Sequence, residues 1–221
     1  MMEPVTIIKH GENPKNLKSR GIILILFFLI ATFNSYSQKI SGGSFAFLEG
    51  QEFFNVVLDF EFAELQRKPE NEYLETVSPA WVKRYEEAKK TIYLQKFVEH
   101  LNKNLKSIKG GDYPDAEYQA EIRVLSIKRA GYGDYLDGSG VRYVKCEIFF
   151  IRKSDSQQLA RITNLNGDSN TKTKFSLIDS PPDIQYDMVR EDFNNYLIGI
   201  AFGNIGHDFG KFIKKQLKKI Q

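Results

Sequence analysis

The sequence predicts an α+β domain in which two long helices cover one face of a mostly antiparallel sheet of four or five strands. Apolar and polar residues alternate over residues 53–62, which is the period of a half-buried strand. Apolar residues recur at steps of three and four over residues 78–108, which is the period of a helix. Three more alternating segments and a last helical segment follow. The expected order is therefore two strands, a helix, three strands and a helix.

The first two strands are expected at residues 44–48 and 53–62, on either side of a turn at residues 49–51. Successive side chains of a strand point to opposite faces of its sheet. The second strand therefore has one continuous apolar face, formed by Phe54, Val56, Leu58, Phe60 and Phe62.

The first helix is expected to begin at Ser78, whose hydroxyl can accept a hydrogen bond from the first turn, with Pro79 at the first helical position. Its apolar stripe comprises Trp81, Tyr85, Ala88, Ile92, Leu94, Val98, Leu101, Leu105 and Ile108. Gly110 and Gly111 follow this stripe, and we expect them to end the helix with a left-handed cap.

Three further strands are expected at residues 117–128, 141–152 and 158–165. The last two should form a hairpin, because the polar residues 153–157 between them are typical of a turn. In the first of the three, the apolar face changes side after Val124, which indicates a β-bulge there.

The last helix is expected over residues 184–219, and four glycines recur along it: Gly199, Gly203, Gly206 and Gly210. Each glycine costs a helix about 1 kcal/mol relative to alanine, so close approach of another backbone is the natural compensation. The stripe either packs against the domain's own sheet or first helix, or mediates self-association or contact with membrane-embedded helices. Lysines at the end of this helix suit its dipole, and a weak contact with anionic surfaces is the alternative.

A leader precedes the domain. An apolar run at residues 22–30 follows a basic segment and precedes small residues at positions 35 and 37. This order is typical of a secretory signal peptide, with cleavage expected between Ser37 and Gln38. A transmembrane anchor is the alternative, but it needs about 20 apolar residues, and polar residues interrupt this run.

Residues 1–37 are therefore expected to form the leader and residues 38–221 a single mature domain. Residues 1–16 are long and mixed for the start of a leader, which favours a misassigned start codon and translation from Leu17. No cysteine lies just after the apolar run, so we expect no lipid anchor. The mature chain should be soluble, without a transmembrane helix, and located in the periplasm or associated with the outer membrane.

Charge argues against a nucleic-acid partner. The whole chain carries 31 basic and 28 acidic residues, a net charge of +3, and the leader supplies two of these three net charges. Binding to a nucleic acid depends on a basic surface, and the mature chain is nearly neutral.

Residue types suited to catalysis are scarce. Cys146 is the only cysteine, and it shares a strand face with Val144, Ile148 and Phe150, so a buried and unreactive thiol is expected. His100 and His207 lack further ligands at metal spacing. No phosphate-binding loop or nucleophile elbow occurs in the sequence. We therefore expect no cofactor, no metal and no catalytic residue.

The glycine-rich segment at residues 131–140 is a candidate interaction surface, carrying Tyr132, Asp134, Tyr135 and Asp137. Tyr113 is expected to add aromatic area near it. The spacing of the two aspartates does not match a calcium-binding loop, so a flexible connection between strands is the expected structure. Exposed aromatic residues on such connections are common in contact surfaces.

Several segments resemble a group of small uncharacterised proteins exported to Gram-negative envelopes. The resemblance rests on residues 47–50 before the strand at 55–60, on Trp81, Tyr85 and Phe97, and on residues 206–215. It covers most of residues 43–217 and implies no activity and no catalytic residue. The order of elements is also similar to the periplasmic domains at the start of TolB and in CsgG proteins.

Three functions follow from these observations. The first is an exported, non-enzymatic binding or assembly protein of the cell envelope that acts through protein–protein contacts. The second is a periplasmic carrier of a lipid or glycan fragment, held between the helices and a sheet face lined by Phe54, Phe60, Phe62 and Phe150. The third is a hydrolase, for which the sequence offers little support.

Overall fold

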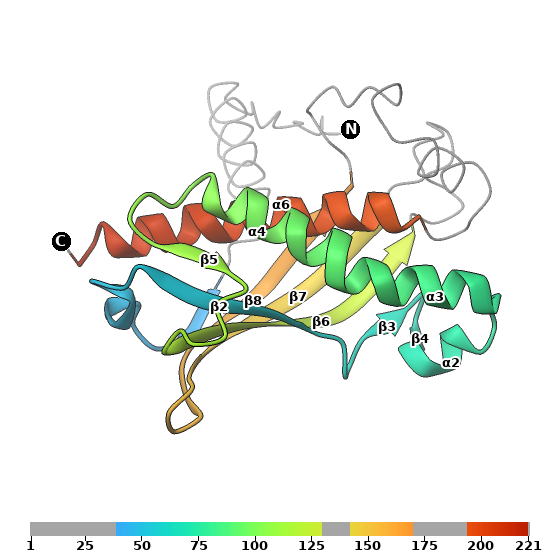
Figure 1. Cartoon of the computed structure of the whole chain (residues 1–221), viewed down its shortest axis with the longest axis horizontal. Coiled ribbons are helices and arrows are strands. Elements are labelled where there is room, and N and C mark those ends of the chain that lie inside the picture. The colour runs from blue at the N-terminus through green and yellow to red at the C-terminus, as the bar shows by residue number, and fades with distance from the viewer. Residues whose placement is uncertain (1–38, 130–141, 170–193, 221) are drawn as a thin grey trace, which may run out of the picture. The chain divides into compact units, whose positions relative to one another are not determined.

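The computed structural model describes residues 39–129, 142–169 and 194–220, which form a sheet with long helices across one face (Figure 1). Contacts between residues divide the chain into two units, and the boundary falls between Ser37 and Gln38. The sequence predicts cleavage of the leader at this same bond, and that cleavage stays a prediction.

Eight strands make up the sheet within the described residues. Six of them form its main path, in the order β1 (Lys39–Gly42), β8 (Gln157–Asp168), β7 (Arg142–Arg152), β6 (Tyr118–Arg129), β2 (Phe53–Asp59) and β5 (Lys109–Gly111). The other two are short: β3 (Glu64–Leu65) pairs with β6 beyond the end of β2, and β4 (Lys68–Pro69) pairs with β3.

The expectation of a mostly antiparallel sheet of four or five strands was wrong, because the sheet is larger and mixed. Strands β1, β8, β7 and β6 are antiparallel neighbours, whereas β2 runs parallel to both β5 and β6, and β3 runs parallel to β6. The physical reason is the connection after β2. A chain that returns through helices across the sheet brings the next strand back in the same direction.

The segment at residues 44–48, expected to be a strand, is a short 3-10 turn, η1 (Ala46–Leu48). Phe45 and Leu48 are both buried, which requires helical rather than alternating spacing. The edge strand β1 lies just before this turn. Gly43 joins them with φ +89°, and a Cβ there would lie 1.9 Å from the carbonyl oxygen of Leu159.

The first long helix is built from α3 (Pro79–Ala88), a π-helical turn η2 (Lys89–Tyr93) and α4 (Leu94–Asn102). Its predicted start is confirmed, since the Ser78 hydroxyl accepts a hydrogen bond from the Trp81 amide at 3.2 Å. A short helix that was not predicted, α2 (Glu70–Leu74), precedes it.

The predicted end of this helix was wrong. Gly110 and Gly111 belong to strand β5 and do not cap the helix. The Asn102 side chain holds Gly110 against the helix end, accepting from its amide at 3.0 Å and donating to its carbonyl oxygen at 2.8 Å. A Cβ on Gly110 would lie 2.6 Å from the Leu101 side chain, so this close approach explains the glycine.

The hairpin of β7 and β8 is confirmed, and so is the bulge, which lies between Val124 and Ser126 of β6.

The last helix, α6 (Asn195–Leu217), is capped by Asn194, whose side-chain oxygen accepts from the amides of Tyr196 and Leu197. Its expected start at residue 184 lies outside the described residues.

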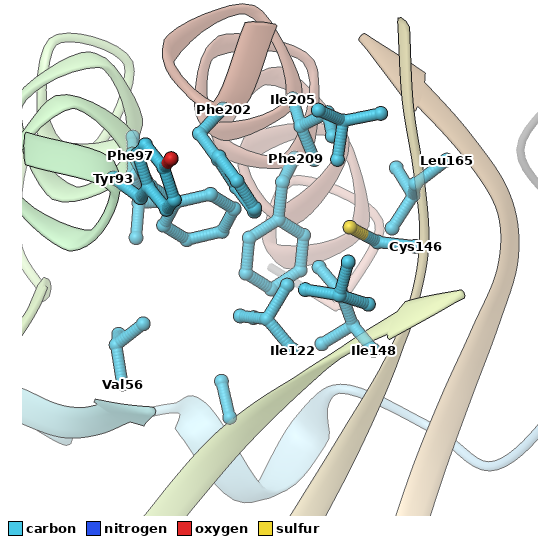
Figure 2. Close-up of a cluster of buried hydrophobic side chains, with 14 of the residues drawn as sticks. Val56, Tyr93, Phe97, Ile122, Cys146, Ile148, Leu165, Phe202, Ile205 and Phe209 are labelled. Carbon is cyan, nitrogen blue, oxygen red and sulfur yellow. The ribbon is translucent and has the colours of Figure 1, made fainter. Parts of the chain in front are cut away.

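The core lies between the sheet and the helix pair α4 and α6 (Figure 2). Phe202 and Phe209 of α6 enter this layer between the rings of the first helix and the apolar side chains of the sheet. Cys146 is fully buried here with a free thiol, as predicted.

The same packing removes the expected place for a carried ligand. Phe54 and Phe150 are fully buried, and the Phe150 ring centroid lies 5.5 Å from that of Phe54 and 5.8 Å from that of Phe209. Side chains thus fill the space between helices and sheet in which a lipid or glycan fragment was expected.

Candidate functional site on the open face of the sheet

Two groups of residues were singled out from the sequence, and the structure describes one of them. Tyr132, Asp134, Tyr135 and Asp137 lie outside the described residues, so their role stays a prediction. Tyr113 lies before β6 and is described, but residues 130–141 are not, so the expectation that Tyr113 adds aromatic area near them also stays a prediction.

The glycine stripe of α6 is buried against the first long helix. A Cβ on Gly206 would lie 2.2 Å from the carbonyl oxygen of Phe97, and one on Gly210 would lie 2.5 Å from that of Leu101. A Cβ on Gly199 would lie 2.5 Å from a side-chain methyl group of Ile92, and Gly203 faces the ring of His100. The stripe thus packs inside the domain, which was the first of its two interpretations. All four glycines are buried within the part of the chain that the structure describes.

The two histidines also serve this helix contact. The His100 ring packs under Gly203, and His207 Nδ1 lies 2.8 Å from Nδ2 of Asn104. No group of three or more His, Cys, Asp or Glu residues in the described ranges could hold a metal ion. Burial raises the pKa of the Cys146 thiol, which keeps it protonated and unreactive.

The face of the sheet opposite the helices carries no helix among the described residues (Figure 1). Side chains that point away from the core gather there from four neighbouring strands, because β2 is paired with β6, β6 with β7 and β7 with β8. We call this surface the open face. It is defined by Asp59, Phe62, Glu121, Arg123, Tyr143, Glu147, Phe149 and Arg161.

Arg123 lies at the centre of the open face, opposite Asp59 on one side and Glu147 on the other. Its Nε donates to Asp59 Oδ2 at 3.0 Å, and its Nη2 donates to Glu121 Oε1 at 2.8 Å. Burial lowers the pKa of Arg123, but these two hydrogen bonds outweigh it and hold the pKa above its usual value. The guanidinium is therefore permanently charged and fixed in direction.

Phe149 contacts two arginines. Its ring centroid lies 4.6 Å from the guanidinium carbon of Arg123 and 5.2 Å from that of Arg161. Arg161 Nη2 in turn donates to Glu147 at 2.7 Å. Because the two arginines cover the ring, Phe149 is only 8% exposed although it lies on the outer side of the sheet.

Phe62 completes this arrangement and lies on the opposite side of the sheet from its predicted position. Strand β2 ends at Asp59, and a turn follows in which the Ala63 amide donates to the carbonyl oxygen of Phe60. Asp59 Oδ1 accepts from the Glu61 amide at 2.9 Å and fixes the turn. Phe62 therefore leaves the core face, lies 5.2 Å from the guanidinium of Arg123 and is 56% exposed.

A second aromatic pair lies at the other end of β2. The rings of Phe53 and Tyr113 are 4.6 Å apart, and the Tyr113 amide donates to the side-chain oxygen of Asn55 at 3.0 Å. Asn55 also donates to Gln119 at 3.0 Å, which continues the polar contacts of the open face along β2 and β6.

Comparison with known proteins gives structural neighbours only. No protein-family model matches the chain, and no curated protein matches it. A PelC dodecamer from Paraburkholderia phytofirmans is similar, with 12% identity over 80% of this chain and 96% of that one, at a TM-score of 0.37. A second crystal form of PelC gives 10% identity over 77% and 96%, at a TM-score of 0.36.

A third structure is XCC0632 from Xanthomonas campestris, described by the family model DUF330. It gives 8% identity over 77% of this chain and 88% of that one, at a TM-score of 0.32. Similarity at this level assigns the chain to neither group, and no function is transferred from it. None of the three is a TolB or CsgG domain, so that likeness in element order stays a prediction.

The open face was not predicted, although one signal for it is present in the sequence. Alternation over residues 141–152 puts Phe149 on the polar side of its strand, with Tyr143 and Glu147. Tyr143 and Phe149 are thus two aromatic residues on the outward side of one strand, and apolar residues that gather on a surface mark interaction sites. Nothing local indicates that Arg123 and Phe62 lie beside it, because these contacts depend on strand pairing and on a turn.

Proposed function

We propose that the mature chain is an exported, non-enzymatic protein of the cell envelope that works by binding another protein through the open face. The observation that carries the proposal is the contact of Arg123 with both Phe149 and the exposed Phe62. Arginine and aromatic residues are enriched in the parts of protein interfaces that contribute most to affinity.

The arginine side chains of the open face are already ordered in the absence of a partner. Carboxylates hold both Arg123 and Arg161 in place, so less side-chain entropy is lost on association than for free arginines. Arg123 uses Nε and Nη2 in these contacts, and its Nη1 has no hydrogen-bond partner within the residues that the structure describes. That nitrogen remains available to donate to a carbonyl or carboxylate group of the partner.

A binding function is favoured over hydrolysis because the candidate nucleophile is buried and the candidate bases pack between helices. Cys146 is buried, and His100 and His207 are used in the contact between α4 and α6.

The leader supports export, and the lack of a cysteine just after it supports a protein without a lipid anchor, in the periplasm or at the outer membrane. No helix of the described ranges is long and apolar enough to cross a membrane.

Photo-crosslinking in living cells tests this function. A photoreactive amino acid replaces Tyr143, and illumination is expected to give one discrete product larger than the chain. Phe62→Ser should lower its yield at least about fivefold, which corresponds to the loss of about 1 kcal/mol at an interface. Ile220→Ser is the matched control, because Ile220 is also an exposed apolar residue but lies at the end of the chain.

A product at twice the mass of the chain would identify a second copy as the partner. A product that is insensitive to Phe62→Ser, or equally sensitive to Ile220→Ser, would contradict a role for the open face. The absence of any product would also contradict it.

A further inference from the structure

A groove of about 470 Å³ lies at the C-terminal end of α6, away from the open face. Three parts of the chain line it: the connection between η1 and β2, the connection between α4 and β5, and the last turns of α6. Its volume falls within the usual range of sites for small molecules.

The floor of the groove is apolar. Leu48 and Ile108 are buried beneath it, and Leu105 and Leu217 are partly buried and packed against the core. Ile220 extends this surface outward and is 38% exposed. The floor therefore offers a continuous apolar strip that passes from the core to solvent.

Lysines line the groove from two separate parts of the chain: Lys106 from the connection after α4, and Lys214 and Lys218 from the last turn of α6 and its C-cap. Lys214 and Lys218 are four residues apart, so they lie on the same side of the helix. None of the three has an ion-pair partner within the described ranges. The helix dipole favours positive charge at the C-terminal end of α6 and so explains the positions of Lys214 and Lys218. It does not explain the position of Lys106, which lies outside that helix.

We propose that this groove binds a single-chain anionic amphiphile of the fatty-acid class. The carboxylate lies among the three lysines, and the acyl chain lies along the apolar floor. Charge complementarity selects the head group, because Lys106, Lys214 and Lys218 outnumber Glu49 and Glu52 in the lining and favour one negative charge. The site differs in place from the filled space between helices and sheet, and it is independent of the open face.

Calorimetric titration of the purified exported protein with dodecanoate tests the proposal. Dodecanoate should bind at least about tenfold more tightly than dodecyltrimethylammonium, which has the same chain length and the opposite charge. Octanoate should bind more weakly than dodecanoate, because each methylene that leaves the floor loses its apolar burial.

A pair of double variants separates the groove from the general charge of the helix end. Lys214→Gln with Lys218→Gln should weaken dodecanoate binding at least about tenfold. Lys215→Gln with Lys219→Gln removes the same charge from the same turns outside the lining, and affinity should stay within about twofold.

Three results would overturn the proposal. The first is no heat of binding with dodecanoate, and the second is an equal loss of affinity in both double variants. The third is binding of the protein to anionic phospholipid vesicles without binding of free dodecanoate, which would assign the lysines to a membrane surface. Each of these results leaves the crosslinking test of the open face unaffected, because that test depends on Phe62.

Discussion

Gly206 of α6 and Phe97 of α4 lie so close that a Cβ on Gly206 would be 2.2 Å from the carbonyl oxygen of Phe97. The two helices therefore touch backbone to backbone at this point. Gly203, one turn earlier, is in a different position, because the nearest atoms to a Cβ there belong to the His100 ring at 3.4 Å. That distance is an ordinary van der Waals contact.

Gly206→Ala and Gly203→Ala form a matched pair that tests this contact. We expect Gly206→Ala to lower the free energy of unfolding by about 1–3 kcal/mol, because α4 has to move away from α6. Gly203→Ala should be neutral or should stabilise the protein by up to about 1 kcal/mol, since alanine favours the helix. Urea unfolding of both variants measures the difference. Equal destabilisation by the two substitutions would show that α4 and α6 are not in backbone contact.

Lys89 forms a second internal contact, in the π-helical turn. Its Nζ lies 2.8 Å from carboxylate oxygens of Glu70 and Glu86, and 4.7 Å from the ring centroids of Phe60 and Tyr85. Burial, and then the Glu70 charge, raise the pKa of the Tyr85 hydroxyl, which stays protonated and donates to Glu70 at 2.6 Å. This cluster ties α2 to the first long helix.

Lys89→Met should therefore lower the free energy of unfolding by about 2 kcal/mol, because Glu70 loses a charged partner in a largely buried site. The Lys89 side chain is only 15% exposed. Lys103→Met is the control, since Lys103 is 56% exposed and its ion pair with Glu99 should contribute less than about 0.5 kcal/mol. Similar losses in both variants, measured by urea unfolding, would contradict the cluster.

His100 predicts a dependence of stability on pH. Burial, followed by the charge of Lys103, lowers the pKa of His100 below its usual value. Lys96 and Glu99 of α4 and His207 of α6 also act on it, with smaller effects. Because the folded-state pKa is lowered, this stability is present above the unfolded-state pKa of about 6.5 and is lost as pH falls through the folded-state value.

We therefore expect the free energy of unfolding to fall between about pH 7.5 and pH 5.5, a range in which ordinary carboxyl groups stay ionised. Much of this fall should disappear in His100→Gln, whose side chain cannot take up a proton. An identical fall in the original protein and in His100→Gln would assign the pH dependence to other groups.

The sequence predicted the elements that local pattern determines. The start of the first helix at Ser78, the bulge at Val124, the hairpin of β7 and β8 and the buried Cys146 all follow from short segments. The two helices on one face were also predicted correctly.

What the sequence did not predict depends on contacts between distant residues. The parallel pairing of β2 with β6 follows from the crossover through the helices, and the alternation of residues 53–62 does not reveal it. The same alternation placed Phe62 in the core, whereas a turn held by Asp59 turns it to the other face. The open face was missed because both of these features are needed to bring Phe62, Arg123 and Phe149 together.

Hydroxyl-radical footprinting tests the central claim most directly, because it does not require the partner to be known. The oxidation rates of Phe62 and Tyr143 are compared between the purified exported protein and the same protein in intact envelopes, with Leu94 of α4 as the internal reference, because it lies outside both the open face and the groove. We predict that Phe62 and Tyr143 are protected at least about fivefold in envelopes relative to Leu94, because a partner covers the open face. Equal oxidation of Phe62 in the two samples would contradict the proposed function.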